Sequence, residues 1–155
     1  MNQEQTFTIH QATLAEVEQI VPLFDAYRQF YGKLSNPGGC REFLLERFKY
    51  HQSVIFLARD ADGIAVGFTQ LYPSFSSGSL AQTFILNDLF VSPAVRRQGV
   101  ASRLLQAAAE YGRMAGAIRL TLSTAVGNQD AQALYEGEGW HRDPDFYVYH
   151  LPLQT

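Results

Sequence analysis

The chain has 155 residues, a formal net charge of −3 and a single cysteine. This length fits one domain, and 46% hydrophobic against 17% charged residues indicates a packed core rather than a disordered chain. The lone Cys40 excludes an internal disulfide and a cysteine-rich metal site. No run of Lys or Arg could neutralise a row of phosphates, so we expect no nucleic-acid partner.

Location and metal content are predicted from what the sequence lacks. Residues 1–5 have neither the basic nor the apolar region of a signal peptide. No apolar stretch approaches the roughly 20 residues needed to cross a bilayer. We therefore expect a cytoplasmic protein with no membrane partner. The four histidines are dispersed without metal-ligand spacing, so we expect no metal.

Strand-like and helix-like segments alternate in the first half of the chain. We expect a strand over Phe7–His10, a helix from the N-cap Thr13 to about Tyr31, a loop over Ser35–Gly39, a helix from about Cys40 to Tyr50 and a strand over Val54–Ala58. Pro22 interrupts the apolar spacing of the first helix, so we expect it to kink or divide that helix.

The second half continues the alternation. A turn at Asp60–Gly63 leads to an expected strand over Ile64–Tyr72, a loop over Ser74–Gly78, a strand over Thr83–Val91, a helix over about Gly99–Ala115, a strand over Ile118–Ser123, a helix over Gln129–Glu138 and a closing strand over Phe146–Leu151. This order predicts one α/β domain over residues 1–155, with its core at about 7–152.

The turn between the strand ending at Val91 and the following helix is the most informative segment. Backbone N–H groups at a helix start point outward, and the helix dipole favours an anion there. Gly99 and Ala101 would let a pyrophosphate approach the backbone, and Arg96 and Arg97 would add positive charge. A strand–glycine–helix turn can also be a plain connection. Neither the dinucleotide fingerprint nor a P-loop is present.

A second motif extends from Asn128 to Trp140. Asn128 is a natural N-cap, and glycines at 137 and 139 end the helix. Tyr135 lies inside it. From its residues alone this segment is a capped helix, and Tyr135 is a core aromatic with a hydroxyl at its rim.

Together these two segments resemble the GNAT acetyltransferases. Arg96-x-x-Gly99-x-Ala101 matches the family pattern R/Q-x-x-G-x-G/A, with Ala101 where glycine is commoner, and the Asn128–Trp140 segment matches the family's second motif. The resemblance covers nearly the whole chain and implies a mixed sheet splayed at an acetyl-CoA site, and a homodimer. It assigns cofactor contacts to these residues: Leu89, Phe90, Val91, Arg96, Arg97, Gln98, Gly99, Val100, Ala101, Ser102, Asn128 and Tyr135.

The resemblance also implies a direct transfer from acetyl-CoA to an amine. Tyr135 would protonate the departing thiolate, since a phenol with a pKa of about 10 stays protonated at neutral pH. The Leu89–Phe90 backbone would supply an N–H to the oxyanion. Asp88 would take the proton of the amine, directly or through water; its alternative role is a structural carboxylate bonded to backbone N–H groups.

The acceptor is expected to be a small-molecule primary amine, because aromatic side chains can host a cation. We expect substrate contacts from Tyr27, Tyr31, Tyr72, Phe75 and Asn87, with Tyr147 and Tyr149 as further wall residues. The segment 71–91 looks like that of diamine and polyamine acetyltransferases, although Asn87 replaces their first acidic residue and cannot act as a base. Two alternatives are a protein lysine or N-terminal acetyltransferase and a non-catalytic acyl-CoA-binding regulator.

Overall fold

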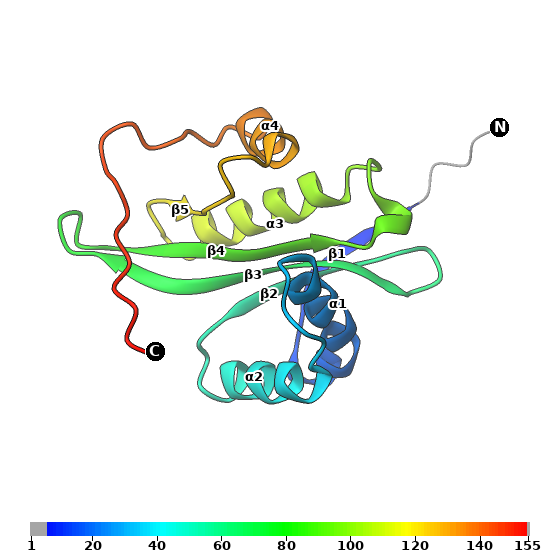
Figure 1. Ribbon diagram of the computed structural model, residues 1–155. Coiled ribbons are helices and arrows are strands. Elements are labelled where there is room, and N and C mark those ends of the chain that lie inside the picture. Colours follow the sequence, from blue (N-terminus) through cyan, green and yellow to red (C-terminus); the bar gives the residue numbers. More distant parts are fainter. Residues whose placement is uncertain (1–5, 155) are drawn as a thin grey trace. The chain divides into compact units, whose positions relative to one another are not determined.

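The computed structural model describes residues 6–154 (Figure 1). The chain divides into two compact units, Met1–Ser123 and Thr124–Thr155, which are taken in turn. Residues 1–5, on which the expected absence of a signal peptide rests, lie outside the described part. The single domain expected over 1–155 stays a prediction.

The first unit is built on a mixed five-stranded sheet in the order β1-β2-β3-β4-β5. Its strands are β1 Thr8–Gln11, β2 Val54–Arg59, β3 Ala65–Ser76, β4 Ala81–Val91 and β5 Leu120–Thr121. The first four pair antiparallel with their neighbours, and β5 runs parallel to β4. The predicted α/β class with a mixed sheet is therefore confirmed.

Helices cover both faces of this sheet (Figure 1). Helices α1, Val17–Phe30, and α2, Pro37–Lys49, lie on one face, and α3, Val100–Met114, lies on the other. On the first face, the rings of Phe24 and Phe68 meet edge to face at 6.1 Å. On the second, Tyr111 of α3 packs between Phe56 and Phe84 at 5.8 and 5.5 Å. Each face thus buries an apolar layer under a helix.

Pro22 does not divide the first helix, which was one of the two outcomes predicted for it; the other, a kink, stays a prediction. A 3₁₀ turn at Leu14–Glu16 leads into α1, which continues from Val17 to Phe30 with Pro22 inside it. A proline lacks the N–H for one helical hydrogen bond. Buried apolar side chains on both sides of the proline anchor the helix to the sheet and offset that loss: Val17, Ile20, Val21, Leu23 and Phe24.

The second helix begins three residues earlier than predicted, at Pro37 instead of Cys40, so Gly38 and Gly39 are helical rather than part of a loop. Asn36 is its N-cap, and its side-chain oxygen accepts a hydrogen bond from the Gly39 N–H at 3.0 Å. Pro37 stands at the first helical position, where a missing N–H costs nothing. The cap and the proline together outweigh the low helix propensity of the two glycines.

The β3–β4 hairpin is longer than predicted. The expected loop began at Ser74, but Ser74, Phe75 and Ser76 still pair with Thr83, Gln82 and Ala81 of β4. Strand β5 is shorter than the predicted Ile118–Ser123, because only Leu120 and Thr121 pair with β4. Pairing with a neighbour, rather than local propensity, sets where these strands end.

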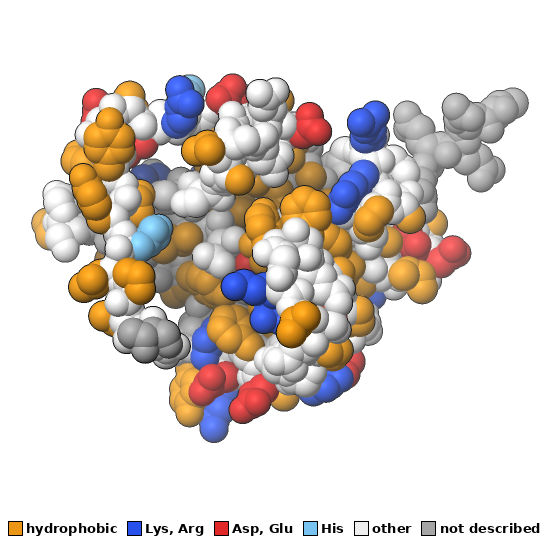
Figure 2. All heavy atoms as spheres, in the orientation of Figure 1, with side chains coloured by type: hydrophobic (Ala, Val, Ile, Leu, Met, Phe, Trp, Pro, Cys, Tyr) orange, Lys and Arg blue, Asp and Glu red, His pale blue; other side chains and the backbone are white. Residues whose placement is uncertain are grey.

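The second unit contains one helix, α4, Gln129–Gly137, close to its predicted bounds. The closing strand predicted over Phe146–Leu151 is wrong: residues 141–154 form no regular secondary structure. The alternation of side chains there is strand-like, but a strand also needs a partner for its backbone groups. The hydrophobic side chains of this segment are exposed (Figure 2), with Tyr147 and Tyr149 each about 90% exposed.

Candidate functional site

A β-bulge in β4 shapes the centre of the sheet. Gln70 of β3 pairs with Asp88 while the next residue, Leu71, pairs with Leu86, so Asn87 has no opposite residue. The Tyr27 hydroxyl of α1 donates a hydrogen bond to the Asn87 carbonyl oxygen at 3.2 Å. Such a bulge bends a strand and redirects the side chains that follow it. It separates the two halves of β4, which have different neighbours.

Beyond the bulge, β4 has an open edge. Within the described residues, β5 pairs only with Phe84 and Ile85, before the bulge. The Ser92 N–H bonds to the Val66 carbonyl on the β3 side. Because backbone groups alternate along a strand, those of Phe90 also face β3, and those of Leu89 and Val91 face the open side. The sheet therefore splays where the sequence predicted it.

The open edge leads into the start of α3. Gly99 is the N-cap with φ 80°, and Arg97 also has a positive φ of 63°. The Arg103 N–H makes the first helical bond, to the Gly99 carbonyl, so the N–H groups of residues 100–102, Val100, Ala101 and Ser102, have no helical acceptor. Nothing lies within 4 Å of a Cβ built at Gly99. This turn presents backbone donors and the positive helix end to an anion.

Arg96 and Arg97 differ in their surroundings. The Arg96 guanidinium donates to the Val91 carbonyl at 3.0 Å and lies over the rings of Phe90 and Phe30, at 5.7 and 5.8 Å. Arg96 is thus engaged with the end of β4 and with α1. Arg97 and Gln98 are exposed on the turn itself. The Arg96 guanidinium is therefore held at the end of β4, while Arg97 carries its charge on the exposed turn.

Asp88 lies buried on the α1 face of the sheet, 3% exposed. Its carboxylate accepts a hydrogen bond from Gln70 Nε2 at 2.6 Å and another from Asn87 Nδ2 at 3.1 Å. Burial raises the pKa of Asp88, and the hydrogen bonds from Gln70, Asn87 and Tyr27 oppose this rise. Within the described residues its hydrogen-bond partners are side chains rather than backbone N–H groups, and both roles considered from the sequence, a base and a structural carboxylate, stay predictions.

Aromatic side chains surround Asp88 on this face. The rings of Tyr27 and Tyr31 are 5.0 Å apart, and Tyr27 also meets Phe68 at 6.1 Å. Burial, and then the charge of Asp88, raise the pKa of the Tyr72 hydroxyl. The structure thus places Tyr27, Tyr72 and Asn87 beside Asp88 and Tyr31 beside Tyr27, whereas Phe75, 76% exposed, lies towards the tip of the β3–β4 hairpin.

The second unit holds the remaining predicted residues. Asn128 caps α4, and its side-chain oxygen accepts from the Ala131 N–H at 3.2 Å. The ring of Tyr135 lies 6.2 Å from that of Trp140, whose N–H bonds to the Tyr135 carbonyl at 3.0 Å. The capped helix predicted from the second motif is confirmed. Tyr135 therefore sits on a locally ordered helix.

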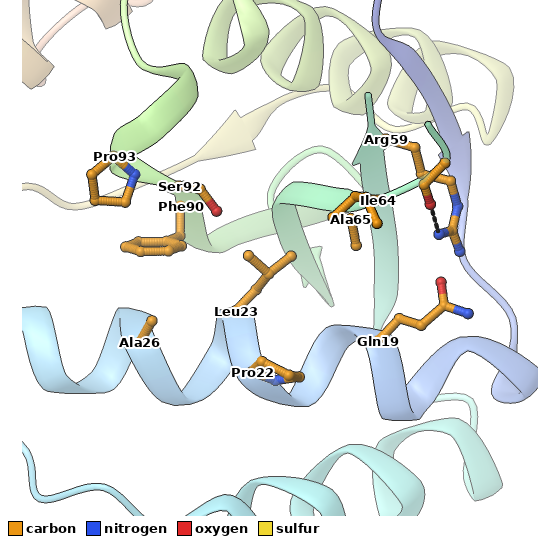
Figure 3. Close-up of a pocket in the computed structure, with 11 residues that line it drawn as sticks. Gln19, Pro22, Leu23, Ala26, Arg59, Ile64, Ala65, Phe90, Ser92 and Pro93 are labelled. Atoms are coloured by element: carbon orange, nitrogen blue, oxygen red, sulfur yellow. Dashed lines mark hydrogen bonds between the residues drawn. The ribbon is translucent and has the colours of Figure 1, made fainter. Parts of the chain in front are cut away.

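A pocket of about 570 Å³ opens between α1, the β2–β3 turn and the end of β4 (Figure 3). Leu23, Ala65 and Phe90 form part of its mostly apolar wall, and Gln19 and Arg59 stand at one end. The Arg59 guanidinium is already bonded to Glu16 and to the Gly63 carbonyl. The pocket therefore offers few uncommitted polar groups, and Asp88 does not line it.

Sequence reasoning missed Gln70 and Thr69, both fully buried. The Thr69 hydroxyl donates to the Asp88 carbonyl oxygen at 2.8 Å. Two polar residues within an otherwise apolar strand, before Leu71, were the available signal. Within residues 6–154, no group of three or more His, Cys, Asp or Glu side chains could hold a metal ion. No helix among the same residues is long and apolar enough to span a membrane.

Comparisons with known proteins give a consistent result. The model of the acetyltransferase (GNAT) family matches residues 20–140. The uncharacterized N-acetyltransferase YhfO of Bacillus subtilis is 46% identical over 143 residues, which cover 92% of this chain and 95% of that protein. A probable acetyltransferase of Haemophilus influenzae is 31% identical over 137 residues, covering 88% and 92%. The crystal structure of a probable acetyltransferase matches with a TM-score of 0.91 at 46% identity, covering 96% and 99%.

Two more distant matches carry named substrates or ligands. The thialysine N-epsilon-acetyltransferase of Caenorhabditis elegans is 26% identical over 146 residues, covering 86% of this chain and 88% of that protein. The aminoglycoside N-acetyltransferase AAC(6')-Iy, solved in complex with CoA, matches with a TM-score of 0.80 at 19% identity, covering 97% and 98%. At that identity the second match concerns the fold alone.

Proposed function

The chain belongs to the acetyltransferase (GNAT) family, and we propose that it transfers an acetyl group from acetyl-CoA to a primary amine of a small molecule. Membership makes it an acetyl-CoA-dependent N-acetyltransferase. The identity of the acceptor amine as a small molecule and the catalytic and binding roles of individual residues are our proposal.

One observation supports the binding mode above all: the open edge of β4 continues directly into the start of α3. An extended pantetheine arm carries amide groups, and these can bond to the outward-facing backbone of Leu89 and Val91 as a neighbouring strand would. The pyrophosphate then meets the N–H groups of residues 100–102 beside Gly99. Arg97 adds charge from solvent, while Arg96 braces the Val91 carbonyl.

We assign the base to Asp88. An ammonium has no lone pair, so one proton must leave before the nitrogen can attack. A carboxylate with a raised pKa accepts a proton better than an ordinary one. Because Asp88 is only 3% exposed, we propose that the proton reaches it through a water rather than by direct contact.

The transfer then needs a proton donor for the departing thiolate and a hydrogen-bond donor for the oxyanion. The neutral amine attacks the thioester carbon, the C–N bond forms and the C–S bond breaks. Tyr135 gives its phenolic proton to the departing thiolate, and the second proton on nitrogen restores the phenol. The Leu89 N–H, which faces the open side of β4, is the oxyanion donor. The products are the acetamide, CoA and one proton released by Asp88.

The acceptor class is supported by the aromatic surroundings of Asp88. Tyr27, Tyr31 and Tyr72 lie on the face that carries the carboxylate, and aromatic faces attract cations. The thialysine acetyltransferase, a full-length relative, acts on an amine of a small molecule according to its name. We also propose a homodimer, which the family resemblance implies, and a cytoplasmic location, which was expected from the sequence.

The test is CoA release with a panel of amines, run beside thermal stabilisation by acetyl-CoA alone. The panel should contain diamines, lysine analogues, aminoglycosides and peptides with either a free N-terminus or a lysine. Turnover with small amines is the expected result. Turnover with peptides only would favour the protein acetyltransferase, and stabilisation without turnover would favour the non-catalytic regulator.

A further inference from the structure

Gln70 is a polar residue in an apolar position. It lies in β3 directly opposite Asp88, at the register pair that follows the bulged residue Asn87 in β4. Its side chain is fully buried, between the buried residues Thr69 and Leu71 on the strand. A leucine would fill such a core position without a desolvation cost.

The nitrogen of the Gln70 side-chain amide has a hydrogen-bond partner, whereas its oxygen has none within the described residues. Nε2 donates to Asp88 Oδ2 at 2.6 Å, and a hydrogen bond to an ionised acceptor is stronger than one between neutral groups. Oε1 is buried and has no hydrogen-bond partner within the described residues. A buried acceptor without a partner destabilises the fold. The unpaired oxygen of Gln70 therefore lowers the stability of the fold, while its amide nitrogen binds the Asp88 carboxylate. A residue selected only for stability would not carry this cost.

Every element packed around Asp88 supplies a group that faces it. Helix α1 supplies the Tyr27 hydroxyl, β4 supplies the Asn87 amide, and β3 supplies Gln70 and the Tyr72 hydroxyl. Arg47 of α2 acts on Tyr72 from further away. The hydrogen bond from Gln70 to the carboxylate, 2.6 Å, is shorter than the one from Asn87, 3.1 Å, and the Gln70 side chain is fully buried. It is the partner most able to hold the carboxylate in one orientation.

We propose that Gln70 is a positioning residue for acetyl transfer: its buried amide N–H holds the Asp88 carboxylate in place and in the ionised form that can accept a proton. This inference rests on the proposed role of Asp88 as the base. Gln70 touches neither substrate nor cofactor in this account and acts only through Asp88.

The consequence is a shift in pH dependence. A donor that bonds to the carboxylate favours its charged form, so removing the donor leaves burial unopposed and raises the pKa of Asp88 further. A hydrogen bond to a charged group corresponds to about one pKa unit or more. The acid limb of the pH profile of kcat/KM should therefore move to higher pH by about one unit. At a pH below the pKa of Asp88, kcat/KM should then be about tenfold lower than in the unaltered protein. Activity should recover on the alkaline side.

The experiment compares Gln70→Leu with Thr69→Val. Thr69 is the neighbouring buried residue and bonds to the carbonyl of Asp88, not to its carboxylate. Both variants lose one buried hydrogen bond, but only Gln70→Leu should move the acid limb. Using one amine for all variants keeps the ionisation of the substrate constant. If Gln70→Leu lowers activity equally at every pH, or if Thr69→Val shifts the limb as far, the proposal is wrong.

A second measurement does not depend on turnover. The ¹³C resonance of the Asp88 carboxyl should titrate at higher pH in Gln70→Met than in the unaltered protein, and an unchanged titration would overturn the proposal. Gln70→Met keeps the length of the side chain if Gln70→Leu folds poorly. Asp88→Asn, measured in parallel, distinguishes the role of Asp88 from that of Gln70. Unchanged activity of Asp88→Asn would refute Asp88 as the base. The titration of the Asp88 carboxyl in Gln70→Met would still report whether Gln70 holds the carboxylate.

Discussion

The turn at the start of α3 and the cluster around Asp88 differ in the groups that they present: backbone N–H groups at the turn and buried side chains in the cluster. The turn presents backbone N–H groups from an exposed loop, and its side chains are small or absent at Gly99 and Ala101. The cluster buries side chains that bond to one another across β3 and β4. A backbone site depends on conformation, and a side-chain site depends on residue identity. Substitutions should therefore affect cofactor binding at the first and proton transfer at the second.

The largest effect is expected from Asp88→Asn. This variant keeps the shape of the side chain but cannot take a proton, so turnover should fall by about 10²–10⁴-fold. The loss should be greatest at low pH, where the amine is protonated, and partly recover as pH rises. Steady-state kinetics across pH measure this, and a small, pH-independent loss would contradict the base.

Asp88→Asn should lower turnover but should not lower the stability of the fold. Because the folded-state pKa of Asp88 is raised, the native protein binds a proton more readily than the unfolded chain, and its stability falls as pH rises through that window. Asp88→Asn removes the buried charge. Its melting temperature at neutral pH should equal or exceed that of the unaltered protein. A clearly lower melting temperature would mark Asp88 as structural.

Tyr135→Phe tests the acid. The ring and its contact with Trp140 are kept and only the hydroxyl is lost. Turnover should fall by about 10²-fold while the affinity for acetyl-CoA is retained, because the proton is needed only as the C–S bond breaks. Tyr111→Phe on α3 is the matched control, expected to keep kcat. If Tyr135→Phe weakens acetyl-CoA binding and leaves kcat intact, Tyr135 is a packing residue.

Gly99→Leu tests the turn. A side chain there would occupy the approach of the phosphate, so acetyl-CoA should bind about tenfold more weakly, or about 1.4 kcal/mol. Gly63 is a matched control, since it has nearly the same positive φ, 79° against 80°, and equally open space. Both leucine variants should lose similar stability from backbone strain. If calorimetric titration finds equal affinity for the two, the turn is only a connection.

The smallest functional effect is expected at Glu16, a carboxylate that belongs to neither region and bonds to Arg59 and His10. Arg59, His10 and the Thr13 N–H bond to it and outweigh its burial, so that the pKa of Glu16 is about 2 instead of 4.5. Its stabilisation is present above pH 4.5 and is lost as pH falls towards 2. Glu16→Gln should cost roughly 1–3 kcal/mol at neutral pH, with unchanged acetyl-CoA affinity. Urea unfolding at pH 7 and pH 3 should show the difference shrinking.

The sequence predicted well those features that depend on local chemistry. Asn128 as a helix cap and Gly99 at the start of α3 were both identified, because caps and positive φ select particular residues. The apolar strand ending at Val91 was likewise placed within two residues. In each case the information lies in the segment itself.

Features that depend on distant partners were missed. The bulge at Asn87 arises from the register between β3 and β4, and neither strand shows it alone. Gln70 acquires its importance only by lying opposite Asp88. The strand expected over Phe146–Leu151 had the right alternation but no partner, so it did not form. Pairing between segments is not visible in a one-dimensional pattern.

We propose that the open edge of β4 and the start of α3 form one continuous acetyl-CoA site. Amide hydrogen exchange at single-residue resolution, with and without acetyl-CoA, tests it without any substitution. With acetyl-CoA bound, exchange should slow at Leu89, Val91 and residues 100–102, with little change at Phe90, whose N–H faces β3. Protection confined to other segments, or none at Leu89 and residues 100–102 at saturating acetyl-CoA, would contradict it.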